Sequence, residues 1–271
     1  MEKKPLELDF CLLIPCYNNK AGLLYSLSSV SYHADLFLIV IADDGSKEPL
    51  EAEDIQKEIA VKLPLVVVRI ESNKGITNAL NTGLDWIEKN QPTKYIARLD
   101  CDDRCDPERF YFQVAHMNSH PEIGLAGSWC LFEEENGKTS YTYKTPELHK
   151  EIYRSMYFRN VFIHPTVIFK KSLITQLGGY PTEFELAEDY ALFWKMIGVS
   201  QTFVTSKILV TCRINRQGIS YKNKRKQLAA RQKVVNNFGK NVILKVVAGM
   251  RLTILFFIPK RLLLRLKDLR G

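Results

Sequence analysis

Short runs of apolar residues recur along the first half of the chain, separated by stretches in which polar and apolar positions are mixed. The four runs are FCLLIP (10–15), LFLIVIA (36–42), LVVVRI (65–70) and YIARL (95–99). Runs of this kind are typical of short strands whose two faces are both covered. The stretches between and after them are compatible with helices, at 19–32, 48–60, 76–90 and 107–119. Strands that alternate with helices predict an α/β fold, built from βαβ units on a mostly parallel, mixed sheet.

The pattern becomes less regular after residue 123. Segments 124–132 and 139–144 flank the acidic turn EEENGK and predict a hairpin. Beyond it we expect a helix near 146–157, a strand near 161–169, a helix near 187–197, a strand over 202–213 and a basic helix over 222–238. Because neither an internal repeat nor a flexible linker is visible, we divide the chain into one α/β domain, 1–220, and a basic helical tail, 221–271.

Charge is distributed unevenly along the 271 residues. The composition, 46% hydrophobic and 25% charged, excludes disordered, collagen-like and low-complexity classes. The formal net charge is +8, but residues 1–212 carry 22 basic and 29 acidic side chains. Residues 213–271 carry 16 basic side chains and one acidic one. The basic character therefore belongs to the C-terminal tail.

The tail combines its cations with apolar residues. Segment 242–258 is apolar except for Lys245, Arg251 and Thr253, and LLLRLKDLRG follows at 262–271. A 17-residue stretch with two internal cations is short for a transmembrane helix. We favour a pair of basic helices on an anionic membrane surface, with a protein contact, a core-covering helix and a true span as alternatives. The large apolar residues between the cations argue against nucleic-acid binding.

Cysteine usage and the N-terminus favour the cytoplasm. The six cysteines form no C-x-x-C pair, so we expect neither a zinc site nor a disulfide framework. The N-terminal sequence MEKKPLELDF enters the first predicted strand directly and lacks the apolar core of a signal peptide.

Two groups of carboxylates follow predicted strands, where ligands of open α/β sheets bind. They are Asp43 and Asp44 after the second strand, and Asp100, Asp102 and Asp103 after the fourth. Turn and cap formation explains one Asp per loop, but three carboxylates within four residues repel one another unless a cation offsets their charge. Oxygen ligands suit Mg²⁺ or Mn²⁺ bridging to a phosphate, and we predict such a site here. For Asp103, a cap of the helix after Pro107 is an equal alternative.

Seven short motifs identify a family resemblance. They are IPCYN (14–18), ADDGS (42–46), SNKG (72–75), YIARLDCDD (95–103), HPTV (164–167), GGY (178–180) and AEDY (187–190). In order and spacing, over residues 10–215, they resemble the family 2 glycosyltransferases. The resemblance implies the nucleotide-sugar-binding GT-A fold and transfer of a sugar, usually from a UDP-sugar, with inversion at the anomeric carbon. P-loop and Rossmann nucleotide sites are disfavoured, because no glycine-rich phosphate motif follows the first strand.

The same resemblance implies roles for individual residues on the donor side. Pro15 and Tyr17 would line the base pocket, and Asp44, with Asp43 beside it, would accept the imide N–H of the base. Residues expected near the nucleotide are Asn73, Lys74 and Arg98. In the D-x-D element, Asp100 would face the ribose and contribute to the metal site, and Asp102 would hold the Mn²⁺ or Mg²⁺ that bridges the diphosphate.

On the acceptor side, the resemblance assigns the general base to Asp189, with Glu188 as a hydrogen-bonding partner of the acceptor. A carboxylate at that place can take the proton of the attacking hydroxyl. Asn215 stands where many relatives have a metal-binding His, and Ala191 where they often have Asp. We expect His164 to be a hydrogen-bonded core residue rather than a metal ligand, and Phe193 and Trp194 to be core residues.

The sequence therefore predicts a glycosyltransferase on the cytoplasmic face of the cell membrane, acting on a saccharide or lipid-linked saccharide acceptor in surface-polysaccharide assembly. A nucleotidyltransferase would need a glycine-rich phosphate loop after the first strand, which IPCYN does not supply. A binding or scaffold protein on a degenerate transferase fold would be expected to lack Asp102 or Asp189, and both are present.

Overall fold

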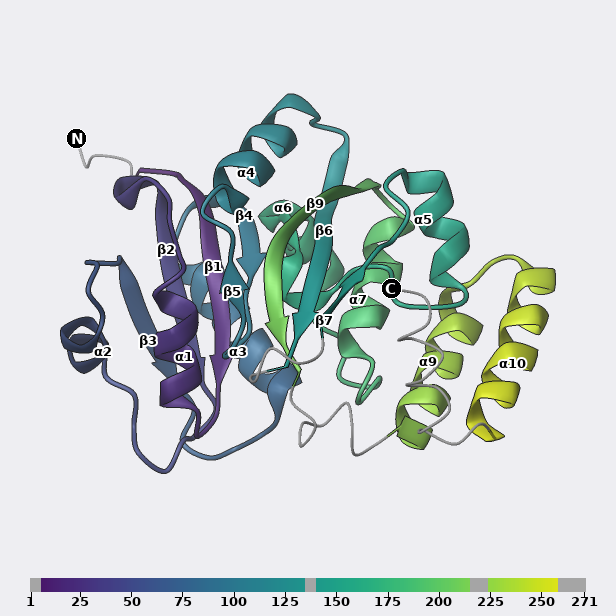
Figure 1. Cartoon of the computed structure of the whole chain (residues 1–271), viewed down its shortest axis with the longest axis horizontal. Helices are drawn as coiled ribbons and strands as arrows, with labels where there is room; N and C mark the ends of the chain where they lie inside the picture. Colours follow the sequence, from purple (N-terminus) through teal and green to yellow (C-terminus); the bar gives the residue numbers. More distant parts are fainter. Residues whose placement is uncertain (1–5, 135–139, 215–223, 258–271) are drawn as a thin grey trace.

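Within residues 6–134, 140–214 and 224–257, which the structure describes, nine strands form one mixed sheet (Figure 1). The structure is a computed structural model of the chain. The strands are β1 (Leu8–Cys16), β2 (Phe37–Asp43), β3 (Leu65–Arg69), β4 (Thr93–Arg98), β5 (Arg104–Cys105), β6 (Ile123–Glu133), β7 (Ser140–Tyr143), β8 (Ile168–Lys170) and β9 (Gln201–Arg213). Their order in the sheet is β3-β2-β1-β4-β8-β6-β9-β5, and β7 pairs with β6.

The sheet is parallel over its first four strands, as the sequence pattern predicts. Neighbouring pairs among β3, β2, β1 and β4 all run parallel, and β6 and β9 are parallel to each other. Strand β8 is antiparallel to both β4 and β6, and β5 is antiparallel to β9. The predicted hairpin is confirmed as the antiparallel pair β6–β7, in which Glu133 lies opposite Ser140.

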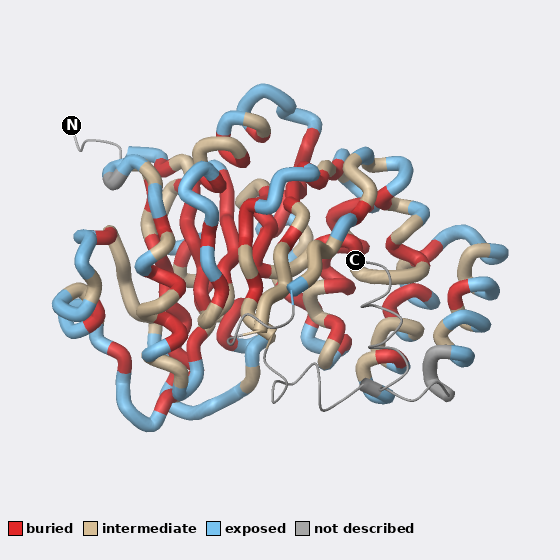
Figure 2. Tube along the Cα trace, viewed as in Figure 1, coloured by how far each residue is buried: buried red, intermediate tan, exposed pale blue. Residues whose placement is uncertain are grey.

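Helices cover both faces of this sheet. They are α1 (Lys20–Leu27), α2 (Ala52–Glu58), α3 (Ile76–Asn90), α4 (Arg109–Ser119), α5 (His149–Met156), α6 (Lys171–Leu177), α7 (Glu188–Ile197), α9 (Lys224–Phe238) and α10 (Val242–Phe257), with short 3-10 turns η1 (Ala34–Leu36) and η2 (His164–Thr166). Alternate residues of β1 enter two cores: Leu13 packs with α3 and α7, whereas Leu12 packs with α1 and α4. This two-sided burial explains why the strand is apolar at successive positions, and Figure 2 shows the central strands coloured as buried along most of their length.

One predicted strand is wrong for most of its length. The segment 161–169 contains the turn η2, and only Ile168–Lys170 belongs to a strand, β8. Pro165 has no N–H to give to a ladder, and the Thr166 N–H instead donates to the Ile163 carbonyl, which closes the turn. Helix α6 follows β8 directly, and the sequence pattern does not predict it.

The C-terminal helices pack against the domain. Val234 and Val235 of α9 and Ala248 of α10 are buried in the core that also contains α7, and the two helices lie together at one end of the molecule (Figure 1). No helix among the described residues is long and apolar enough to cross a membrane. The predicted boundary at residue 220 and the expected second tail helix at 262–271 lie outside the described residues, so the domain division stays a prediction.

Candidate active site

The carboxyl ends of β2, β1 and β4 lie side by side at one edge of the sheet. Asp43 is the last residue of β2 and lies opposite Cys16, the last residue of β1. Asp100 follows β4 by two residues. The two carboxylate groups that the sequence singles out therefore flank β1, at the edge where open α/β sheets bind ligands.

Asp44 anchors the loop that carries Asn73 and Lys74. Its carboxylate is buried and accepts the Lys74 N–H and the Gly75 N–H, each at 2.9 Å. Gly45, with φ of +71°, permits this approach, because a Cβ there would lie 2.5 Å from the carbonyl carbon of Ser72. The side chains of Asn73 and Lys74 are exposed, so both can reach a ligand.

Tyr17 is exposed to solvent, whereas Asp43 is buried. Tyr17 is 48% exposed just beyond the end of β1, so its side chain is open to a ligand. Asp43 is fully buried and accepts the Arg69 Nη1–H at 2.5 Å and the Ser46 N–H at 3.0 Å. Its carboxylate therefore stabilises the loop after β2. Pro15 lies half-buried in β1, directly before Cys16.

The D-x-D carboxylates are half-buried and each has a cationic neighbour. Asp100 Oδ1 lies 2.6 Å from Arg98 Nη2. Asp102 Oδ1 lies 3.6 Å from Arg213 Nη1, and its Oδ2 accepts the Asn19 amide at 2.8 Å. Asp102 has φ of +75°, in the left-handed region that Asp tolerates better than most residues.

These two carboxylates fit a magnesium or manganese ion that shares its ligands with a nucleotide diphosphate. No group of three or more His, Cys, Asp or Glu side chains that could hold a metal occurs among the described residues. One or two carboxylates completed by substrate phosphates are, however, the usual mode for Mg²⁺. Asn215, where relatives often have a His, lies outside the described residues.

The helix cap is the wrong role for Asp103. Helix α4 begins at Arg109 with Glu108 as its N-cap, so Asp103 does not cap it. The buried Asp103 carboxylate instead accepts the Arg213 N–H at 3.0 Å, and burial raises the pKa of Asp103 well above its usual range. Asp103 therefore ties the D-x-D loop to the end of β9, next to the Arg213 that faces Asp102.

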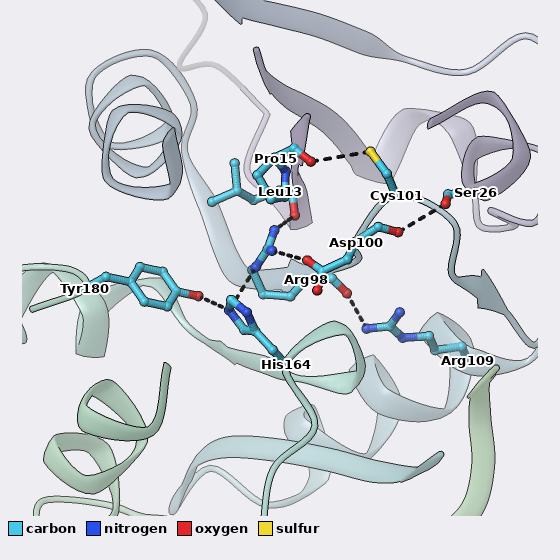
Figure 3. A network of polar contacts seen from close by, with 9 residues as sticks. All are labelled: Leu13, Pro15, Ser26, Arg98, Asp100, Cys101, Arg109, His164 and Tyr180. Atoms are coloured by element: carbon cyan, nitrogen blue, oxygen red, sulfur yellow. Dashed lines mark hydrogen bonds and ion pairs between the residues drawn. The ribbon is translucent and has the colours of Figure 1, made fainter. Parts of the chain in front are cut away.

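Arg98, expected near the nucleotide, is fully buried beneath Asp100 (Figure 3). Its guanidinium also donates to the Leu13 carbonyl and, at 3.2 Å, to Nε2 of His164. The Tyr180 hydroxyl contacts the same His164 nitrogen at 2.7 Å. His164 is thus hydrogen-bonded, as predicted, although it lies in a 3-10 turn and not on a strand.

The second pair of carboxylates begins α7, where acidic side chains are favoured by the helix dipole. Asp189 Oδ2 accepts the Asn160 amide at 2.9 Å, and its Oδ1 accepts the Tyr190 N–H at 2.6 Å. Burial and the charge of Asp189 raise the pKa of Glu188 to about 7. Burial also raises the pKa of Asp189, whereas the positive charge of Arg231 on α9 lowers it.

The D-x-D element and the α7 carboxylates share one site. Asp100 pairs with Arg98, Arg98 donates to His164, and the His164 ring packs against Phe193 of α7 with ring centroids 6.0 Å apart. In agreement with this proximity, the charge of Asp100 raises the pKa of Glu188 and that of Asp189. A carboxylate with a raised pKa is suited to accept a proton near neutral pH. The structure thus brings together Asp100, a candidate metal ligand just after β4, and Asp189, a candidate base at the start of α7, although about ninety residues separate them in the sequence.

Residues 11–177 match the family described as Glycosyl transferase family 2. The chain belongs to this family. It is 33% identical over 195 residues to the amylovoran biosynthesis glycosyltransferase AmsE of Erwinia amylovora, in an alignment that covers 70% of each chain. It is 31% identical over 160 residues to the UDP-Gal:alpha-D-GlcNAc-diphosphoundecaprenol beta-1,3-galactosyltransferase of Escherichia coli, covering 56% of each. This family 2 chain is therefore an enzyme of the glycosyltransferase class.

Solved structures show the same GT-A fold. The S. aureus protein TarS (residues 1–349) in complex with UDP-GlcNAc superposes with a TM-score of 0.62 at 21% identity, over 88% of this chain and 69% of that one. The mannosyltransferase PcManGT of Pyrobaculum calidifontis, in complex with GDP-Man and Mn²⁺, superposes with a TM-score of 0.64 at 16% identity, over 91% of this chain and 70% of that one. The predicted fold class is confirmed for this glycosyltransferase.

Sequence reasoning missed the residues that support the site. Asn19 holds Asp102, Asn160 holds Asp189, and Arg213 and Arg231 supply positive charge to the two carboxylates. Asn160 and Arg231 lie outside every motif of the family resemblance, so only the fold shows that they face the site. Asn19, directly after IPCYN, could have been suspected from its place at the end of β1.

The paired α7 carboxylates predict a shift of the Glu188 pKa in Asp189→Asn. Burial and the negative charge of Asp189 raise the pKa of Glu188 to about 7, so removing that charge should lower it. The Glu188 pKa is followed by NMR titration of its side-chain carboxyl carbon, and Glu185→Gln, which removes an exposed charge just before α7, should lower it less. An unchanged Glu188 pKa in Asp189→Asn would contradict this coupling.

Proposed function

We propose that this glycosyltransferase moves a sugar from a UDP-sugar to a hydroxyl of a lipid-linked saccharide, with inversion, during assembly of a surface polysaccharide at the cytoplasmic face of the membrane. The observation that carries the proposal is the line of contacts that runs from Asp100 through Arg98 and His164 to α7, the helix that begins with Glu188 and Asp189. A nucleotide diphosphate bound at the first group would leave its sugar facing the second.

The nucleotide is proposed to lie over the ends of β1 and β2. The exposed Tyr17 ring and Pro15 supply apolar walls for the base, and the buried Asp44 carboxylate lies within the loop that they border. Both Asp44 oxygens already accept backbone N–H groups, but each oxygen keeps a lone pair that can accept the imide N–H of uracil. Asn73 and Lys74 are placed to contact the remainder of the nucleotide.

The carboxylate of Asp102 and Oδ2 of Asp100 would hold a divalent cation together with the oxygens of the diphosphate. A cation bound there neutralises the charge that develops on the diphosphate as it leaves. Arg213, at 3.6 Å from Asp102, adds positive charge at the same place. The Mn²⁺ in the complex of PcManGT supports a cation of this kind.

Asp189 is the proposed general base of a single displacement. Its carboxylate takes the proton of the acceptor hydroxyl while the hydroxyl oxygen bonds to the anomeric carbon and the bond from that carbon to the diphosphate oxygen breaks. Attack from the face opposite the diphosphate inverts the anomeric centre. Asn160 orients the Asp189 carboxylate, and Glu188 is left to contact the acceptor.

Relatives and surface chemistry support a lipid-linked acceptor. The similar E. coli enzyme acts on a diphosphoundecaprenol-linked sugar, as its name states. Helix α10 exposes a row of apolar side chains, Val242, Ile243, Val246, Val247, Met250 and Ile254, with the exposed cations Lys240 and Arg251 beside them. A basic helix with an apolar outer face fits the surface of an anionic membrane, where such an acceptor is embedded.

Substitutions on this α10 face should weaken binding to vesicles. Val246→Glu combined with Met250→Glu removes apolar contact and adds repulsion, so co-sedimentation with anionic liposomes falls while UDP binding is unchanged. Wild-type binding should also weaken as salt rises. Val61→Glu, at an exposed apolar residue beyond α2, serves as the control and should sediment like wild type. Equal sedimentation of all proteins would show that α10 does not contact the membrane.

A donor screen tests the proposed function as a whole. Thermal denaturation of the purified chain is followed with a panel of UDP- and GDP-sugars, each with and without Mn²⁺. We expect UDP-sugars to raise the melting temperature, and Mn²⁺ to increase the shift. Stabilisation by GDP-sugars alone would overturn the UDP specificity, and no stabilisation by any nucleotide would overturn the donor site.

A further inference from the structure

The Arg98 guanidinium is a buried cation whose direction is fixed at three points. It donates to the Leu13 carbonyl, to Asp100 Oδ1 at 2.6 Å and, through Nε, to His164 at 3.2 Å (Figure 3). Among the residues that the structure describes, the carboxylate paired with this guanidinium is that of Asp100, whose side chain is one-third exposed, whereas the guanidinium has no exposure. Because one oxygen of Asp100 is used by Arg98, the orientation of the other follows from the orientation of Arg98.

His164 accepts the hydrogen bond of Arg98. A guanidinium in a protein is always protonated, so its Nε–H is a donor and His164 Nε2 must present a lone pair. The imidazole is then neutral with its proton on Nδ1. Burial and the charge of Arg98 lower the pKa of His164 well below its usual range, which agrees with this assignment. The Tyr180 hydroxyl, 2.7 Å from the same nitrogen, donates to the same lone pair, so Arg98 and Tyr180 together fix the orientation of the ring.

Tyr180 is itself rigidly placed. It is buried, and its backbone N–H and carbonyl form a pair of hydrogen bonds with the Asn81 side chain at 2.8 and 2.9 Å. Gly178 and Gly179 precede it with φ of +76° and +79°, a conformation that favours glycine. His164 begins the turn η2, which the Thr166 N–H closes. The motifs HPTV and GGY, to which no role has been given, therefore meet at the contact between His164 and Tyr180.

The contacts of Arg98 fix the orientation of the Asp100 carboxylate. Oδ2 of Asp100 has no hydrogen-bond partner within the part of the chain that the structure describes, so it is left to a ligand. If the support of Arg98 were removed, the guanidinium could turn away from Asp100 and both oxygens would change direction. Residues that orient a metal-binding carboxylate typically contribute roughly 10–100-fold to metal affinity or activity.

We propose that His164 and Tyr180 are positioning residues that hold the Arg98 guanidinium against Asp100, and so aim Oδ2 of Asp100 at the nucleotide diphosphate and its cation. The inference rests on the proposed function, since it assumes that a nucleotide and a divalent cation bind beside Asp100. It gives HPTV and GGY a role on the donor side, although GGY lies in the segment that leads into the acceptor-side helix α7.

The test compares variants that differ in the acceptor offered to Arg98. His164→Leu removes the acceptor, whereas His164→Gln replaces Nε2 with an amide oxygen that can accept from Arg98. Calorimetric titration of UDP with Mn²⁺ should show affinity about tenfold weaker for His164→Leu and close to wild type for His164→Gln. With a donor in hand, KM for the nucleotide-sugar should rise while KM for the acceptor stays unchanged.

Tyr180→Phe and Tyr95→Phe form a matched pair of hydroxyl deletions. Tyr95, also buried and on β4, donates to Asn118 at 2.9 Å and has no contact with Arg98. We expect both variants to lose thermal stability but only Tyr180→Phe to bind UDP and Mn²⁺ more weakly. Unchanged UDP affinity in His164→Leu, or equal losses in His164→Gln and His164→Leu, would overturn the positioning role. Failure of the wild type to bind UDP with Mn²⁺ would overturn the proposed donor site as well, which separates the two results.

Discussion

Asp189→Asn is expected to lower kcat by at least ~10²-fold, the usual scale for losing a general base, while leaving donor affinity near that of wild type. The amide keeps one oxygen that can accept the Tyr190 N–H, and its NH₂ group can donate to Oδ1 of Asn160 once the Asn160 amide turns over, so the start of α7 should keep its structure. It cannot take a proton from the acceptor hydroxyl. Steady-state transfer rates and UDP titrations on the same preparations measure both quantities.

Glu183→Gln is the matched control for Asp189→Asn. It removes one negative charge from an exposed position shortly before α7 and should leave kcat within a factor of about two, because exposed charges interact weakly in water. If Asp189→Asn instead lost donor affinity and kept its turnover, Asp189 would be a binding residue and the base would have to be sought elsewhere, with Glu188 the first candidate.

Asp102→Asn should lower transfer by at least roughly 10²-fold, the scale of removing one electrostatic group aimed at developing charge. Asparagine tolerates the left-handed backbone at this position and can still accept the Asn19 amide. What is lost is the negative charge that would hold the divalent cation. Titration of UDP with and without Mn²⁺ should show that the gain from Mn²⁺ disappears.

Asp106→Asn supplies the comparison for Asp102→Asn. Asp106 is exposed, follows the D-x-D element by four residues, and accepts the Glu108 N–H through an oxygen that asparagine also has. This variant should behave like wild type in both titrations. Transfer that persists in EDTA, or an Asp102→Asn variant that still gains affinity from Mn²⁺, would contradict metal assistance at this site.

Most of the fold could be predicted from sequence because its signal is local. A strand such as β1, with both faces buried, must be apolar at successive positions, and this pattern is readable without knowing its neighbours. The segment around Pro165 was misread for the opposite reason. Its residues are mostly apolar, but the proline lacks an N–H and the Thr166 N–H closes a turn, so the strand begins only at Ile168.

The site could be predicted only in part, because burial and pairing depend on distant residues. The motifs point to Asp43, Arg98 and Asp103, but not to their surroundings. The structure shows that Asp43 is held by Arg69, that Arg98 lies beneath Asp100, and that Asp103 is bonded to β9. Arg69 and β9 are remote from their partners along the chain, and the burial of Arg98 depends on distant residues such as His164, so spacing along the chain carries no sign of these contacts.

The configuration of the transferred sugar tests the central claim most directly. The chain is supplied with Mn²⁺, the α-linked UDP-sugar that stabilises it best, and a diphosphate-lipid-linked saccharide acceptor, and the anomeric configuration of the product is determined by NMR. A single displacement with Asp189 as base predicts a β-linked product. An α-linked product would contradict it, since retention cannot arise from one attack on the face opposite the diphosphate.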